Sequence, residues 1–184
     1  MAAEIENCIK RKSLASEIVS KLNNDTLPLR VIHNDTKLNN ILFDRRTNTP
    51  LCVVDLDTVM PGAVCYDFGD SVRSAASVTG DGQDLSIVHL DMDLFEACAA
   101  GYINSAKEFL TDAEAESFII APMVITYENA LRFLTDYLDG DIYFRIRHPL
   151  QNLLRCRAHL KLVDDMEKKL PEMERIIKKH MNNK

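Results

Sequence analysis

The sequence predicts a domain that is mainly α with a small β-hairpin, an α+β fold. Two observations carry this prediction. Apolar residues recur at helical spacing over most of the chain after Gly62, and two apolar, partly β-branched runs flank a turn-rich stretch at 44–50. A doubly wound parallel sheet would need strands to alternate with helices throughout, and this chain shows no such alternation.

The N-terminal part is expected to hold one helix followed by an extended segment. Residues 4–22 carry apolar side chains at roughly helical spacing, so we expect a leading helix within 1–28. The residue before Pro28 is pushed toward the extended region, which predicts a short extended segment at 27–33.

The hairpin is predicted from three adjacent stretches. "NILF" (40–43) and "LCVVDLD" (51–57) have the composition of strands, and "DRRTNTP" (44–50) supplies turn residues between them. The two strands should therefore pair back on each other and bring their polar flanking residues together.

The part of the chain after Gly62 is expected to be a helical body. Thr111 and Glu114 fit a capping box, Pro149 fits a first helical position, and 78–86 is the most loop-like stretch. The predicted helices span residues 66–77, 91–109, 112–138, 149–166 and 170–181.

The length, net charge and cysteine content of the chain limit its expected size, partners and location. The chain has 184 residues, enough for one domain or one lobe, and a formal net charge of -6, so we expect no nucleic-acid or membrane partner. It contains no apolar run long enough to span a membrane and no signal-peptide pattern. Five scattered cysteines without C-x-x-C spacing suggest reduced thiols, so a cytoplasmic location is expected.

The stretch "HNDTKLNN" (33–40) concentrates the residue types that phosphoryl-transfer chemistry requires. Asp35 lies between the extended lead-in and the hairpin, where a general base could reach a substrate hydroxyl. Asn40 offers an amide oxygen to a hard divalent cation, and Lys37 places a positive charge between the two. Taken alone, the stretch is equally well explained as a turn that hydrogen-bonds its own backbone.

A second acidic residue strengthens the interpretation. Asp55 follows the apolar strand that pairs back through the hairpin, so its carboxylate can meet Asn40 and share a magnesium ion. Phosphoryl transfer mainly needs two things here: a metal ion bound to the phosphates and an aspartate next to the attacking hydroxyl.

An H-x-D-x-x-x-x-N stretch followed by an apolar strand ending in Asp resembles the aminoglycoside phosphotransferase and choline kinase superfamily, which shares the protein-kinase-like fold. "YDFGDSVR" (66–73) and "LRFLTDYLDGDIYF" (131–144) extend the match. Together these stretches resemble the N-acetylhexosamine 1-kinases, which phosphorylate the anomeric hydroxyl of N-acetylglucosamine and N-acetylgalactosamine. The motifs run from Leu29 to about Met166, most of the chain.

The resemblance implies a role for individual residues. Asp35 would be the catalytic base, and Asn40 and Asp55 would bind Mg²⁺ and, through it, the phosphates of ATP. His33 would brace the catalytic loop, and Asp67 would accept backbone N–H groups of that loop. For Asp67 the alternative is a helix N-cap.

The same resemblance assigns a substrate-binding role to Arg132 and Tyr143, which match a sugar-contacting arginine and tyrosine. Simpler explanations exist for both. Arg132 could form an ion pair with Glu128 within one helix, and Tyr143 could belong to the core. Arg73 is interpreted as structural.

The chain is expected to be a single C-terminal kinase lobe, 1–184, without an N-terminal nucleotide lobe. The 28 residues before Leu29 contain no glycine and are read as one helix, so they cannot form a phosphate-covering loop. Within the lobe, 29–57 would be the catalytic loop and metal hairpin, and 58–184 the helical body. We expect the N-terminal lobe to be a partner and the isolated chain to be inactive.

Three other functions stay open at this point. A haloacid-dehalogenase-type phosphatase would use a D-x-D-x-T stretch at 55–58, with Asp57 as acid and base. A helical lobe could bind a sugar or a partner protein without catalysis. A different acceptor within the superfamily, such as an amino alcohol or a drug, would favour an acidic pocket, whereas Arg132 beside a tyrosine favours a neutral sugar.

Overall fold

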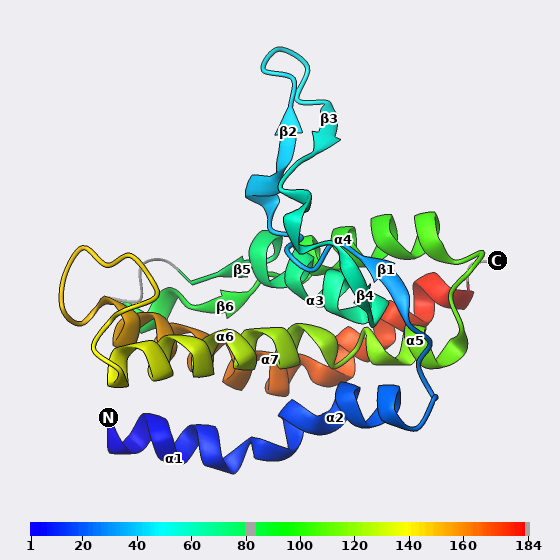
Figure 1. The fold of residues 1–184 in the computed structure, drawn as a ribbon. Coiled ribbons are helices and arrows are strands. Elements are labelled where there is room, and N and C mark those ends of the chain that lie inside the picture. Colours follow the sequence, from blue (N-terminus) through cyan, green and yellow to red (C-terminus); the bar gives the residue numbers. More distant parts are fainter. Residues whose placement is uncertain (80–83, 183–184) are drawn as a thin grey trace.

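The computed structural model describes residues 1–79 and 84–182 of the chain. It is mainly helical, with small antiparallel sheets, and this confirms the predicted fold class. The hairpin stands out from a layered helical body (Figure 1). The predicted loop at 78–86 falls partly on residues 80–83, which lie outside the described residues.

The helical body is built around two long helices, α6 and α7, that pack along each other. In Figure 1, α3 and α4 lie on one side of this pair and α1 and α2 on the other. The helices are α1 (Ala2–Lys10), α2 (Lys12–Asn23), α3 (Val64–Ala75), α4 (Met92–Ala106), α5 (Asp112–Ser117), α6 (Ala121–Leu138) and α7 (Gln151–Asn182). The short 3₁₀ turns are η1 (Leu38–Asn40), η2 (Leu56–Thr58) and η3 (Leu85–Ile87).

Within the described residues, the strands form three separate antiparallel pairs, β1–β4, β2–β3 and β5–β6. The β2–β3 pair is the predicted hairpin, with Ile41 opposite Val53. The strands are β1 (Arg30–Ile32), β2 (Ile41–Phe43), β3 (Pro50–Val53), β4 (Met60–Gly62), β5 (Ser77–Val78) and β6 (His89–Leu90).

The β1–β4 pair was not predicted, because three-residue strands leave no periodic signal. Tertiary contacts hold it in place instead. Arg30 of β1 donates from Nε and Nη2 to the two carboxylate oxygens of Glu114, at 2.8 and 2.9 Å. Glu114 also completes the predicted capping box with Thr111 at the start of α5. The capping box therefore also anchors the strand that leads into the loop at 33–40.

Two predicted helices are each broken into two. The leading helix breaks at Arg11, whose backbone leaves the helical region and whose guanidinium pairs with Asp164 and Glu167 of α7. The helix predicted at 112–138 breaks between α5 and α6, and α6 restarts with Pro122 in its first turn. Proline has no N–H to continue a preceding helix, so it suits a new start.

Two predicted helices are instead one. Helix α7 runs through Pro171, and the predicted gap between 166 and 170 does not exist. Met166 and Met173 on either side of Pro171 are fully buried, so packing outweighs the loss of one backbone hydrogen bond. The prediction that Pro149 opens this helix was wrong, because the helix begins at Gln151.

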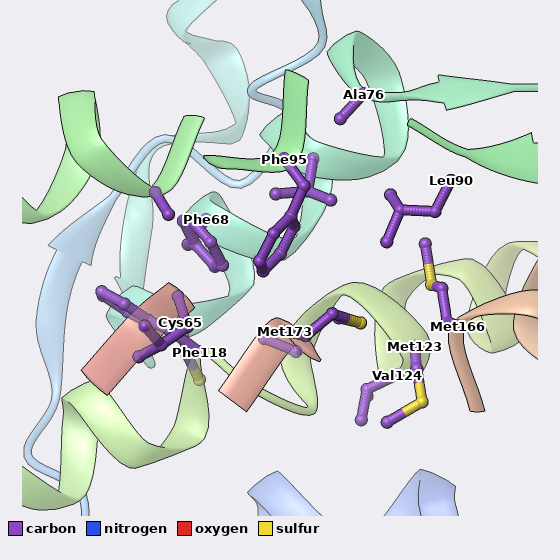
Figure 2. Close-up of a cluster of buried hydrophobic side chains, with 14 of the residues drawn as sticks. Cys65, Phe68, Ala76, Leu90, Phe95, Phe118, Met123, Val124, Met166 and Met173 are labelled. Carbon is purple, nitrogen blue, oxygen red and sulfur yellow. The ribbon is translucent and has the colours of Figure 1, made fainter. Parts of the chain in front are cut away.

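Phe68 of α3 is at the centre of the core (Figure 2). Its ring stacks on Phe118 with centroids 4.6 Å apart and meets Phe95 edge-on at 6.2 Å. Burying large aromatic rings in contact contributes both hydrophobic and ring–ring stabilisation. Helix α3 is thereby fixed against the body at the residue next to Asp67.

Helix α3 also approaches α6 closely at a glycine. A Cβ placed on Gly69 would lie 2.6 Å from the backbone oxygen of Ala121, a distance that real Cβ atoms do not occupy. Only glycine therefore permits this spacing between α3 and α6.

We predict that Gly69→Ala destabilises the fold by about 1–3 kcal/mol, because the backbone of α6 must move to admit the methyl group. Gly101→Ala is the matched control, since Gly101 lies in α4 and a Cβ there meets nothing within 4 Å. That control should stabilise by about 0.5–1 kcal/mol. Urea unfolding of both variants measures the difference, and equal stabilities would contradict the close approach of the two helices.

Candidate active site

The loop between β1 and β2 is fixed by the carboxylate of Asp67. The backbone N–H groups of His33 and Asn34 donate to its two oxygens, each at 2.8 Å. The hydroxyl of Thr36 donates to the backbone oxygen of Asp67 at 2.6 Å. Asp67 lies within the first turn of α3, whose N-cap is Ala63, so the N-cap alternative is wrong.

His33 joins this loop to the segment that carries Asp55. Its ring Nε2 lies 3.1 Å from the backbone oxygen of Val54. The hydroxyl of Thr58 donates to the backbone oxygen of His33 at 2.7 Å. These contacts make His33 a bridge between the two segments, and they assign no proton-transfer task to its ring.

Asp35, Asn40 and Asp55 come together at the base of the hairpin. Asn40 donates from Nδ2 to the backbone oxygen of Asp35 at 2.9 Å and to its Oδ2 at 3.0 Å. Lys37 forms an ion pair with Asp35 and lies 3.7 Å from Oδ2 of Asp55. The residues proposed from the sequence as base and metal ligands therefore share one cluster.

Two residues of this cluster have left-handed backbone. Asn34 has φ 65° and Asp55 has φ 66°. Asparagine and aspartate tolerate this region better than other non-glycine residues, and strained positions of this kind concentrate at functional sites. The turn at Asp55 directs the chain from β3 into η2 and leaves its carboxylate about half exposed.

Two neighbouring side chains, Lys37 and Asn40, lower the pKa of Asp35. Partial burial by itself would raise the pKa of Asp35, but hydrogen bonds from Lys37 and Asn40 outweigh it and hold the pKa below its usual value. Asp35 is therefore ionised at neutral pH, as an acceptor for a hydroxyl proton must be.

The donor set fits a magnesium ion that is shared with phosphates. Among residues 1–79 and 84–182, no group of three or more His, Cys, Asp and Glu side chains could hold a metal ion. Magnesium usually takes one or two carboxylates and completes its octahedron with phosphate oxygens and water. The exposed carboxylate of Asp55 and the amide oxygen of Asn40 match that requirement.

A polar pocket of about 270 Å³ opens beside Asp35. Polar faces of two helices form its walls: Tyr66, Asp70 and Arg73 of α3 face Glu128, Asn129 and Arg132 of α6. The full lining is Asn34, Asp35, Thr58, Tyr66, Asp70, Arg73, Ile125, Glu128, Asn129 and Arg132. An acceptor bound in this pocket would lie next to the carboxylate of Asp35.

A second pocket of about 480 Å³ adjoins the first and shares Glu128 and Arg132 with it. The guanidinium of Arg132 lies over the rings of Tyr143 and Phe144, 5.8 and 5.4 Å from their centroids. Of the ion pairs within the described residues, none joins Arg132 to Glu128, and Tyr143 is 74% exposed. Both simpler explanations, an intrahelical ion pair and a core tyrosine, are therefore wrong.

The loop that carries Tyr143 is held by a buried aspartate. Asp136 of α6 accepts the backbone N–H groups of Tyr143 and Phe144 at 2.7 and 3.0 Å. It also accepts the side-chain amide of Asn152 from α7 at 2.7 Å. Charge-assisted bonds of this kind fix the loop against both helices and so set where Tyr143 stands.

Most of the residues that line the first pocket were not predicted from the sequence. A signal was present, because Tyr66, Asp70 and Arg73 recur at spacings of four and three and therefore share one face of α3. Glu128 and Arg132 have the same relation on α6. Polar side chains along one face of an otherwise buried helix could have indicated a pocket wall.

The family model described as "Phosphotransferase enzyme family" matches residues 3–115, more than half of the chain. The chain belongs to this family. It is thus a phosphotransferase with the C-terminal lobe of the protein-kinase-like fold, and members of the family generally use ATP and Mg²⁺. The matched residues include the stretch at 33–40, the hairpin and Asp67.

The phosphatase interpretation was wrong. It requires several parallel strands, whereas the described part of the chain contains three antiparallel pairs. Thr58 is also the fourth residue counted from Asp55, where the D-x-D-x-T pattern needs the fifth.

No helix within the described residues combines the length and the apolar character needed to cross a membrane.

We predict that Lys37→Met raises the pKa of Asp35, because burial then acts without the opposing ammonium. Since the pKa of Asp35 is lowered in the folded chain, the Lys37–Asp35 pair stabilises the fold at pH values above the ordinary pKa of aspartate. That contribution is lost as pH falls through the lowered value. Carboxyl ¹³C NMR titration measures the change, with Asp165 as the internal control because its lowered pKa depends on Lys169. An unchanged Asp35 titration would contradict this role of Lys37.

Proposed function

We propose that this chain is the catalytic and substrate-binding lobe of an ATP-dependent sugar kinase. The acceptor is the anomeric hydroxyl of an N-acetylhexosamine. The proposal rests on membership of the phosphotransferase family, on the stretches that resemble N-acetylhexosamine 1-kinases, and on the position of one side chain.

That side chain is Asp35. On one side it is hydrogen-bonded to Asn40 and paired with Lys37, close to Asp55. On the other side it lines the pocket formed by α3 and α6. A catalytic base has to stand between the phosphate donor and the acceptor hydroxyl, and this position meets that requirement.

Each residue then has a defined task. Asp35 orients the acceptor hydroxyl and takes up its proton. Asn40 and Asp55 hold Mg²⁺, which when bound neutralises charge on the phosphates of ATP. Lys37 pairs with Asp35 and helps to hold its pKa low, and Asp67 with His33 keeps the loop in register.

The charges around the pocket support a neutral, polyhydroxylated acceptor. Lys37 pairs with Asp35 and Arg73 pairs with Asp70, while Glu128 and Arg132 carry opposite charges on the other wall. The pocket is therefore mixed in charge, unlike the acidic site that a cationic amino alcohol or aminoglycoside would favour. Arginine and carboxylate side chains together supply donors and acceptors for hydroxyl groups.

The exposed hairpin supports an N-terminal lobe as the partner. Leu42, Phe43, Leu51 and Val53 are each 44–64% exposed on a two-stranded hairpin that projects from the body (Figure 1). An isolated hairpin of this kind is marginally stable, and clustered exposed apolar side chains indicate a contact surface. A nucleotide-binding lobe packed there would complete the cleft for ATP.

We predict that Asp35→Asn, in this chain assembled with an N-terminal lobe, lowers the turnover number about 10²–10⁴-fold and leaves ATP affinity nearly unchanged. Asp55→Asn should weaken Mg²⁺-ATP binding as well as turnover, because it removes a charged ligand. Arg132→Ala should raise KM for the sugar more than KM for ATP. Steady-state kinetics with both substrates varied measures all three.

Two variants serve as matched controls. Asp57→Asn changes an exposed aspartate two residues from Asp55, and Arg147→Ala changes an arginine of the loop after α6 that lines neither pocket. Both should keep normal kinetics. Full activity of Asp35→Asn, or loss of activity in Asp57→Asn alone, would contradict the proposed roles.

A further inference from the structure

The wall of the acceptor pocket contains a carboxylate with one unused oxygen. Asp70 of α3 is 9% exposed, and Arg73 donates to its Oδ1 from Nε at 2.8 Å and from Nη2 at 2.7 Å. The other oxygen, Oδ2, is buried and receives no hydrogen bond from any described residue.

A buried, ionised oxygen without a donor is costly, and such groups are rare in folded proteins. Asp70 lines the pocket beside Asp35, so a group bound in that pocket can supply the donor once the carboxylate turns toward it. Rotation about the Cβ–Cγ bond of an aspartate is soft, so either oxygen can be turned toward a group in the pocket.

Arg73 determines what kind of donor fits. Its guanidinium already compensates the charge of Asp70, so an ammonium group would gain little there and would be repelled by Arg73. A hydroxyl group gains a charge-assisted hydrogen bond to the carboxylate without that repulsion. Arg73 has five N–H donors in all, and those that do not bind Asp70 can reach a neighbouring oxygen.

We propose that Asp70 and Arg73 bind two adjacent hydroxyl groups of the acceptor, one on each side chain. Asp70 accepts a hydrogen bond from the first hydroxyl, and Arg73 donates to the oxygen of the second. This inference rests on the proposed function and narrows the acceptor to a sugar with a vicinal diol away from the phosphorylated position. It also gives Arg73 a ligand-binding task in place of the structural role expected from the sequence.

The experiment is an NMR titration of the ¹⁵N-labelled 184-residue chain with N-acetylglucosamine and its 3-, 4- and 6-deoxy derivatives. Asp70→Asn should weaken N-acetylglucosamine binding roughly tenfold, the effect of one hydrogen bond to a charged group. For one deoxy sugar, the one that lacks the bound hydroxyl, the wild type and Asp70→Asn should bind equally. Likewise, the wild type and Arg73→Lys should bind one deoxy sugar equally, the one that lacks the hydroxyl adjacent to the first.

Asp165→Asn is the matched control, because Asp165 is also a partly buried helical aspartate that pairs with a basic side chain, Lys169, and it lines neither pocket. It should bind every sugar as the wild type does. Two results would overturn this inference and leave the proposed function standing. Asp70→Asn could bind N-acetylglucosamine as tightly as the wild type does, or its affinity could fall by the same factor for all three deoxy sugars. If the wild type bound none of the four sugars, both this inference and the proposed function would fail. Should Asp70→Asn not fold, the Arg73→Lys series decides by itself.

Discussion

The site depends on one carboxylate that joins a helix to a loop. Asp67 accepts the backbone N–H groups of His33 and Asn34 and is itself almost fully buried in α3. Because those two residues directly precede Asp35, the position of the Asp35 carboxylate is set by α3. Charge-assisted bonds from backbone donors are strong enough to hold the left-handed conformation at Asn34.

Four consecutive residues of α3, 67–70, have four different tasks, since successive helical residues point about 100° apart. Asp67 holds the loop that carries Asp35, Phe68 fills the core, Gly69 admits α6, and Asp70 borders the pocket beside Asp35. The helix therefore fixes the loop and one pocket wall relative to each other. Its close approach to α6 brings the second wall, with Glu128 and Arg132, to the same place.

The sequence was sufficient for the parts of the fold that have a local signal. The hairpin was found from its turn residues, the capping box at Thr111 from its spacing, and the cluster of Asp35, Asn40 and Asp55 from the hairpin. Features that depend on tertiary contacts were missed or misplaced. The break at Arg11 follows from an ion pair with α7, the continuity through Pro171 from burial on both sides, and the β1–β4 pair from Arg30. The pocket between α3 and α6 was missed because periodicity reports which face of a helix is polar and not what that face meets.

The measurement that tests the central role of Asp67 most directly is amide hydrogen exchange on the 184-residue chain and its Asp67→Asn variant. The account predicts that exchange at His33 and Asn34 accelerates about tenfold or more, while the amides of α6 stay protected. Asp91→Asn is the matched control, because Asp91 also accepts two backbone N–H groups, at the start of α4. It should leave His33 and Asn34 unchanged. Unaltered exchange at these two amides in Asp67→Asn would show that the loop is held by other contacts.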